Sequence, residues 1–230
     1  ANKKALILKP DSARAHSAIA LLYKEDAQLE KAYAHYEKSA QIEASSTVSI
    51  TMGELALHLG EIDTSIKHYE NALESENNNT VLLTRLGLLY WETNAYEKAA
   101  KVFEKAYKIA PKNAKHFLNY YEISLVSQTS LNEEEEKLFM DTFKEDKPAL
   151  MTYKMLEIIK LSIEQKDILP ALKEWDSNYS DLRLSWSFTQ IFAWLDNSAL
   201  SEDEKYKVRK ILGFFIAYQQ RYNLEHKASL

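Results

Sequence analysis

The sequence of 230 residues contains no cysteine, which excludes disulfides, thiolate metal ligands and cysteine nucleophiles. Its four glycines and four prolines are few for this length, which suits helices better than sheets with many tight turns. The net charge of −5 argues against a nucleic-acid binder, since such proteins usually carry a basic stripe. No uninterrupted apolar run reaches the roughly 18 residues that mark a candidate membrane-spanning helix. With 46% hydrophobic residues, the chain can nevertheless bury a sizeable core.

Three stretches of the chain repeat one pattern of side chains, at a spacing of 33 and then 34 residues. The small residues of the pattern are Ala32, Ser65 and Ala99, and its aromatic residues are Tyr36, Tyr69 and Phe103. Self-similarity of this length indicates a repeat array, in which each unit stacks on its neighbours because it cannot bury its apolar face alone. We set the three units at residues 13–46, 46–79 and 80–113.

The third unit resembles the tetratricopeptide repeat, a helix–turn–helix unit, and the first two units carry parts of the same pattern. The resemblance rests on Leu86-Gly87, Tyr90, Tyr96, Ala99, Phe103, Ala106 and Pro111. Small residues in such a unit let two helices approach closely, and large residues at helical spacing fill the space between them. The resemblance implies an all-α fold, a right-handed superhelical α-solenoid of stacked helix–turn–helix repeats.

The repeat boundaries predict three parts of the chain. Residues 1–12 are expected to be the end of a preceding unit, because Pro10 occupies the position that Pro111 holds in the third unit. Residues 13–113 are the three units, and residues 114–230 form degenerate helical hairpins with a C-terminal capping helix. Since the chain begins within a unit and without an initiator methionine, we expect it to be a piece of a longer protein.

Local patterns predict further helices after the third unit. Residues 130–133 read as the cap of a helix over about 131–145, and residues 152–185 as a degenerate fifth unit. One helical face is predicted through Leu184, Phe188, Ile191 and Leu195. Ser201 and Glu204 are expected to cap a long final helix that reaches about residue 222.

In tetratricopeptide repeats the first helix of each unit lines the concave face, so the resemblance implies that a partner binds there. The expected partner-binding residues are Leu21, Ile50, Glu54, Leu57, Arg85, Leu88, Trp91, Glu92, Leu118 and Leu125. The apolar members suit an amphipathic helix or an extended apolar segment, with Trp91 as the principal contact. Two alternatives stay open: Trp91 packs against a neighbouring unit, or downstream helices of the same chain occupy the groove.

Family members that bind chaperone tails hold a terminal carboxylate with Lys, Asn and Arg side chains at set positions. Of these positions only Arg85 matches, while Ser17, Leu21 and Thr51 stand where Lys and Asn are required. The sequence also has no His-Glu-x-x-His, no glycine-rich phosphate loop and no Gly-x-Ser-x-Gly. We therefore expect neither a chaperone-tail receptor nor an enzyme, and no metal or cofactor.

The function that these patterns indicate is a non-catalytic protein–protein interaction scaffold, whose groove binds a peptide or helix of a partner. One alternative is an accessory region of a larger bacterial enzyme, such as a membrane glycan ligase or a glycosyltransferase. Another is an envelope or pilus assembly factor. Neither the partner nor the compartment, cytoplasm or bacterial periplasm, follows from the sequence.

Aromatic residues crowd the last 45 positions of the chain. They are Trp186, Trp194, Phe214, Phe215, Tyr218 and Tyr222. Core and cap packing is the interpretation that we favour for them, since a terminal unit needs a polar outer face to keep a stack soluble. The alternative is a face through which the C-terminal helices form a homodimer.

Overall fold

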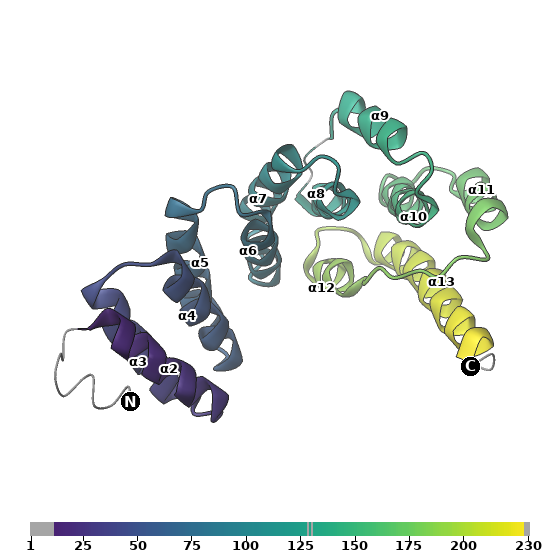
Figure 1. Cartoon of the computed structure of the whole chain (residues 1–230). Coiled ribbons are helices and arrows are strands. Elements are labelled where there is room, and N and C mark those ends of the chain that lie inside the picture. The colour runs from purple at the N-terminus through teal and green to yellow at the C-terminus, as the bar shows by residue number, and fades with distance from the viewer. Residues whose placement is uncertain (1–11, 128, 130, 228–230) are drawn as a thin grey trace. The chain divides into compact units, whose positions relative to one another are not determined.

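The computed structural model describes residues 12–127, 129 and 131–227 (Figure 1). All regular secondary structure in this part of the chain is helical, in twelve α-helices labelled α2 to α13. The predicted all-α helical-repeat class is therefore confirmed. The predicted end of a preceding unit lies outside the described residues, apart from Ser12. The described residues form two compact units, which we call the N-terminal and the C-terminal unit, and the boundary between them lies within α6, between Tyr90 and Trp91.

The N-terminal unit consists of consecutive helices that pack in chain order. Contacts join α2 to α3, α3 to α4, and α4 to α5. Residues without bulky side chains lie where these helices meet, and Ala20, Ala32 and Ala72 are fully buried. The helices of this unit are α2 (Ala13–Glu25), α3 (Leu29–Ile42), α4 (Ser46–His58), α5 (Ile62–Ser75) and the part of α6 (Thr80–Glu92) up to Tyr90.

The same turn joins the two helices of four hairpins, α2–α3, α4–α5, α6–α7 and α10–α11. One residue in each turn has a positive φ: Ala27 (56°), Gly60 (79°), Asn94 (60°) and Gln165 (58°). This left-handed conformation ends a helix and reverses the chain, and glycine adopts it without strain. The following N–H donates to a carbonyl five residues back, from Gln28 to Tyr23, Glu61 to Ala56 and Lys166 to Leu161. The pair that contains Gln165 is thus built like the N-terminal hairpins.

The C-terminal unit is organised around α8 and α10, which contact each other. Helix α7 packs on α8, while α11 and α13 pack on α10. Aromatic rings fill its core: Phe117 stacks on Phe139 with ring centroids 4.4 Å apart, and Trp175 meets Phe215 edge-on at 5.0 Å. The helices are α7 (Tyr96–Ile109), α8 (Ala114–Ser127), α9 (Glu133–Thr142), α10 (Lys147–Ile163), α11 (Leu169–Tyr179), α12 (Thr189–Asn197) and α13 (Glu202–Lys227).

Two of the predicted helix starts can be compared with the structure. The backbone N–H of Ser201 donates to Glu204 Oε2 at 2.6 Å, and the N–H of Glu204 donates to Ser201 Oγ at 3.4 Å, so this capping box is confirmed. Helix α9 begins at Glu133 and is capped by Asn132, whose side chain accepts from the N–H of Glu134 at 3.0 Å. Ser130 of the predicted cap lies outside the described residues.

The helix predicted through Leu184 and Phe188 is wrong in its first half. Residues 183–188 have no helical structure, and α12 begins only at Thr189. Leu184 and Phe188 are buried, with 1% and 4% exposure, while the residues between them alternate between exposed and half-buried. An alternation of this period is that of an extended chain. We call residues 182–188 the extended segment.

Contacts from α13 account for this extended conformation. The Tyr218 hydroxyl donates to the carbonyl of Leu182 at 2.5 Å, and Gln219 Nε2 donates to the carbonyl of Leu184 at 2.9 Å. These side-chain donors satisfy backbone carbonyls that a helix would have used internally. The tertiary contacts thus outweigh the helical pattern of the local sequence.

Three of the six C-terminal aromatic residues lie in the core of this unit. Trp194, Phe215 and Tyr218 are buried, and Trp175 contacts both Phe215 and Tyr218. Phe214 remains partly exposed on α13. Dimer formation through these helices stays a prediction.

Candidate protein-binding surface

Six of the ten predicted partner-binding residues belong to the N-terminal unit, and all six lie on the first helices of hairpins. Leu21 is on α2, Leu57 on α4 and Leu88 on α6, and their exposures of 49%, 36% and 40% are large for leucine side chains. Ile50 of α4 is half-buried. These helices therefore carry apolar surface that their own packing leaves open to solvent.

Glu54 ties the three first helices together through charge. Arg85 Nη1 of α6 lies 2.5 Å from Glu54 Oε1, and Lys24 Nζ of α2 lies 3.5 Å from Glu54 Oε2. Burial acts to raise the pKa of Glu54, but the Arg85 hydrogen bond and the charge of Lys24 outweigh it and hold the pKa below its ordinary value. Glu54 is therefore ionised at neutral pH, between two cations.

Each member of this ion-pair group has an exposed leucine three residues away on its helix. Residues three apart lie on the same face of a helix. Because the ion pairs bring α2, α4 and α6 together on this face, the leucines surround the charged group. We call this set the leucine–ion-pair surface, formed by Leu21, Lys24, Glu54, Leu57, Arg85 and Leu88.

The four remaining predicted residues lie in the C-terminal unit and differ in accessibility. Trp91 and Leu118 are buried, with exposures of 4% and 3%, so neither offers its side chain to a partner. Glu92 is exposed and Leu125 is half-buried. Because burial leaves no contact area for a partner, Trp91 is not part of the surface that we propose, although its residue type favoured it.

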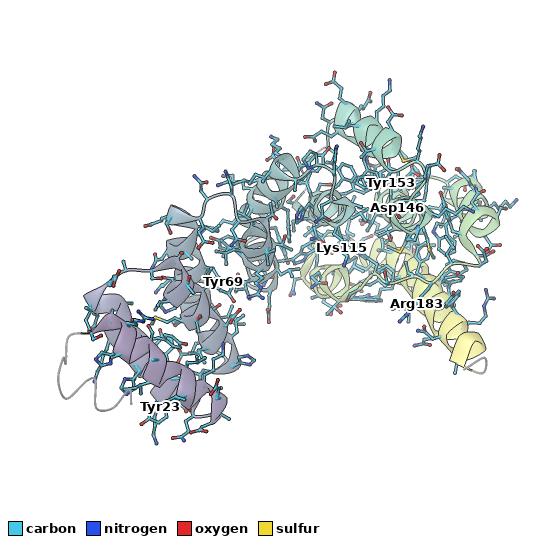
Figure 2. All side chains as sticks on the ribbon, in the orientation of Figure 1. Tyr23, Tyr69, Lys115, Asp146, Tyr153 and Arg183 are labelled. Carbon is cyan, nitrogen blue, oxygen red and sulfur yellow. The ribbon has the colours of Figure 1, made fainter. Side chains whose placement is uncertain are left out.

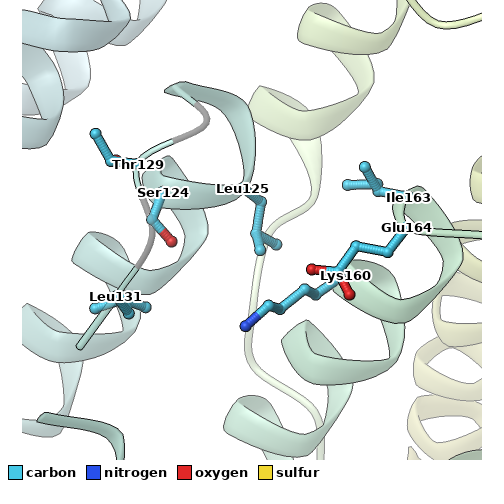
Figure 3. Close-up of a pocket in the computed structure, with 7 residues that line it drawn as sticks. All are labelled: Ser124, Leu125, Thr129, Leu131, Lys160, Ile163 and Glu164. Atoms are coloured by element: carbon cyan, nitrogen blue, oxygen red, sulfur yellow. The ribbon is translucent and has the colours of Figure 1, made fainter. Parts of the chain in front are cut away.

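Leu125 lines a cavity of about 330 Å³ between the C-terminal ends of α8 and α10 (Figure 3). Lys160 of α10 extends along one side of it, opposite Leu125. The ammonium group of Lys160 is engaged, 3.6 Å from Glu136 Oε1 and over the ring of Tyr121. The other lining residues are Ser124, Thr129, Leu131, Ile163 and Glu164.

We call the face of α8 that carries Glu122 its inner face, and there another part of the chain covers the helix. Trp186 of the extended segment donates its indole N–H to Glu122 Oε2 at 3.1 Å. Glu122 is 5% exposed, and burial raises its pKa to about 8, although the Trp186 hydrogen bond opposes the shift. The helical spacing of the sequence does not predict that Trp186 and Glu122 meet. The signal for it was the alternation of Leu182, Leu184, Trp186 and Phe188, which fits an extended segment as well as a helix.

Among the residues that the structure describes, no three or more His, Asp or Glu side chains are grouped as metal ligands would be. None of the described helices combines the length and the apolar character needed to cross a membrane.

The chain is similar to curated proteins only in part. It is 27% identical over 130 residues to the CTR9 homolog of Arabidopsis thaliana, which is 56% of this chain and 12% of that protein. It is 32% identical over 91 residues to the BBSome complex member BBS4 of Bos taurus, which is 40% of this chain and 18% of that protein. The chain thus spans less than a fifth of either relative.

Among solved structures, the fold is similar to that of YrrB, described as a TPR protein with an unusual peptide-binding site. The TM-score is 0.60 at 16% identity, over 79% of this chain and 93% of that chain. This identity is low, so the likeness concerns the fold alone.

Residues 44–112 match the tetratricopeptide repeat family. That range includes the second predicted unit and all but the last residue of the third, where Gly53, Tyr69, Ala99 and Phe103 lie. Proteins of this family bind protein partners, and its members are typically non-catalytic scaffolds, so the fold is that of a protein–protein interaction scaffold. The helical hairpins, their repeated turns and the family match together identify residues 44–112 as tetratricopeptide repeats.

Proposed function

We propose that the N-terminal unit binds a helix or an apolar segment of a partner protein on the leucine–ion-pair surface. The observation that carries the proposal is the placement of three exposed leucines around the Lys24–Glu54–Arg85 group. Apolar side chains of a partner would cover the leucines and remove them from water. The charged group supplies fixed donors and one carboxylate that orient the partner.

This arrangement favours an amphipathic partner over a purely acidic or basic one. Glu54 already neutralises part of the charge of Lys24 and Arg85, so the surface offers no unopposed cation cluster. Burying a leucine side chain is worth about 1.5–3 kcal/mol. Three half-covered leucines can therefore supply a substantial share of a micromolar affinity, which corresponds to about 8 kcal/mol.

Affinity capture with single-site variants tests the proposal. The wild-type chain is first used to capture partner proteins, which are then identified. The affinity of each partner's binding segment is then measured by calorimetry for the wild-type chain and for Leu57→Asp and Leu88→Asp. Each variant is expected to weaken binding at least tenfold, because an aspartate cannot be buried against an apolar partner. The matched control is Leu138→Asp, which changes an exposed leucine of α9 in the C-terminal unit.

Equal affinities for Leu57→Asp, Leu88→Asp and Leu138→Asp would remove the surface from partner binding. Circular dichroism melting of each variant confirms that the helices are retained. The roles as an accessory region of a larger enzyme and as an envelope or pilus assembly factor remain alternatives, and no contact in the described residues favours either over a scaffold.

A further inference from the structure

The extended segment lies on the C-terminal unit as an extended peptide lies on a receptor. Its buried side chains, Leu184 and Phe188, are separated by four positions and point to the same side of the chain. Its backbone carbonyls accept side-chain hydrogen bonds from Tyr218 and Gln219 of α13. Main-chain hydrogen bonds combined with pockets for alternate side chains are the usual mode of extended-peptide recognition.

Trp186 stands between these two anchored side chains and is held differently. Its side chain is half-buried, and its hydrogen bond to Glu122 is made to α8 rather than to α13. It also borders a cavity of about 470 Å³ formed by the start of α8, the connection from α9 to α10, and the extended segment. Lys115 and Asp146, both labelled in Figure 2, line this cavity too. The cavity leaves space beside Trp186, whereas Leu184 and Phe188 are buried.

The carboxyl group under Trp186 is only partly satisfied. Glu122 Oε2 accepts the indole hydrogen bond, but the buried Oε1 has no hydrogen-bond donor among the described residues. A neutral carboxyl tolerates this surrounding far better than a carboxylate, whose charge needs water or a cation. An ionised Glu122 requires water or a cation at Oε1. Trp186, which binds the other oxygen of this carboxyl group, is only half-buried.

No charged neighbour offsets the burial of Glu122. Burial and the Trp186 hydrogen bond are the two influences on its pKa, and a charged group on the elements packed against α8 is not among them. The charged side chains of those elements are engaged elsewhere or exposed. Lys108 of α7 pairs with Glu104. On α10, Lys154 pairs with Glu157, and Lys160 pairs with Glu136 of α9. Asp196 of α12 pairs with Arg209, and Arg183 of the extended segment is exposed. On α8 itself, His116 contacts Asn113.

We propose that Trp186 and Glu122 form a proton-dependent latch, in which Trp186 covers the inner face of α8 while Glu122 is neutral and leaves it when Glu122 ionises. The burial that raises the pKa of Glu122 to about 8 places the change just above neutral pH. The latch belongs to the C-terminal unit and does not depend on partner binding at the leucine–ion-pair surface.

Nuclear magnetic resonance of the full ¹⁵N-labelled chain tests the latch through the indole N–H signals of its four tryptophans. Trp186→Phe identifies the Trp186 signal by its loss. In the wild-type chain this signal is expected to move with pH with a midpoint near 8. In Glu122→Gln it is expected to stay fixed, because the amide oxygen still accepts the hydrogen bond but does not titrate.

Hydrogen exchange measures the opening itself. The reference is the indole N–H of Trp175, which is also buried and hydrogen-bonded, to the carbonyl of Met151 at 3.1 Å. The ratio of the Trp186 and Trp175 exchange rates cancels the effect of hydroxide on both. Because the ionised fraction of a group with a pKa of about 8 rises about tenfold between pH 7 and 9, the ratio is expected to rise by about the same factor. A constant ratio in the wild-type chain overturns the latch, and this measurement needs no variant to fold. Equal titration of the Trp186 signal in wild-type chain and Glu122→Gln also overturns it.

Discussion

Gly53 and Tyr69 approach so closely that a Cβ atom on Gly53 would lie 2.5 Å from Cε1 and 2.7 Å from Cδ1 of the tyrosine ring. The ring is fully buried between α4 and α5, where Figure 2 shows it among the surrounding side chains. Glycine inside a helix costs about 1 kcal/mol relative to alanine. Its presence in α4 is explained by this contact, because a larger residue would push the two helices apart.

Gly53→Ala is expected to lower the free energy of unfolding by about 1–3 kcal/mol, since overpacking of a buried ring outweighs the gain in helix propensity. The matched control is Gly213→Ala in α13, where nothing lies within 4 Å of the added Cβ atom. That variant is expected to gain up to about 1 kcal/mol. Urea unfolding of both measures the difference, and stabilisation by both substitutions would contradict the close approach.

The repeated hairpins were predictable because their packing is encoded locally. Ala32 and Tyr36 of α3 recur as Ser65 and Tyr69 of α5, and all four side chains are buried. A small residue and a ring one helical turn apart give the same helix contact wherever they occur. Sequence spacing alone therefore sets the helices, their order and the turns between them.

The extended segment was not predictable in the same way, because its residues satisfy two patterns at once. Leu184 and Phe188 continue a helical face into α12, and they also alternate with exposed residues. The choice is made by Tyr218, Gln219 and Glu122, which are distant in sequence. The accessibility of Trp91 was undecided for a related reason, since residue type does not tell whether a tryptophan faces a partner or its own core.

Trp91→Ala is expected to destabilise the chain rather than to act on partner binding alone. Its side chain is buried, and replacing a buried tryptophan by alanine costs about 3–5 kcal/mol. A loss of this size lowers the melting temperature by about 6–20 °C in a chain of this length. The control is Leu88→Ala on the same helix, which changes an exposed side chain and is expected to shift the free energy of unfolding by less than about 1 kcal/mol. Equal melting temperatures for Trp91→Ala and wild-type chain would restore Trp91 as a surface contact.

Glu54→Gln is expected to remove a pH-dependent contribution to stability. The folded-state pKa of Glu54 is held below the ordinary 4.5, so its ion pairs stabilise the fold above that pH and lose this effect as the pH falls through the folded-state value. The pairs are partly exposed, and the variant should lose less than about 1 kcal/mol at pH 7. Thermal melts between pH 3 and 7 measure the gap to wild type, which closes on acidification. The exposed Glu92→Gln serves as the control, and a gap for Glu54→Gln that stays constant with pH would contradict the prediction.

Glu122→Gln is expected to change the pH dependence of stability in the opposite direction. The pKa of Glu122 is raised from 4.5 to about 8. Its contribution to the free energy of unfolding is therefore fully present below pH 4.5 and is lost as the pH rises through 8. A single group of this kind gives at most about 1.4 kcal/mol per pH unit. All other titrating groups are common to both proteins, so the difference between their unfolding free energies from pH 5 to 9 isolates Glu122. The amide's own hydrogen bonds add an offset that does not vary with pH. The variant must therefore gain on the wild-type chain as the pH rises, and parallel curves would mean that Glu122 is already hydrated in the folded chain.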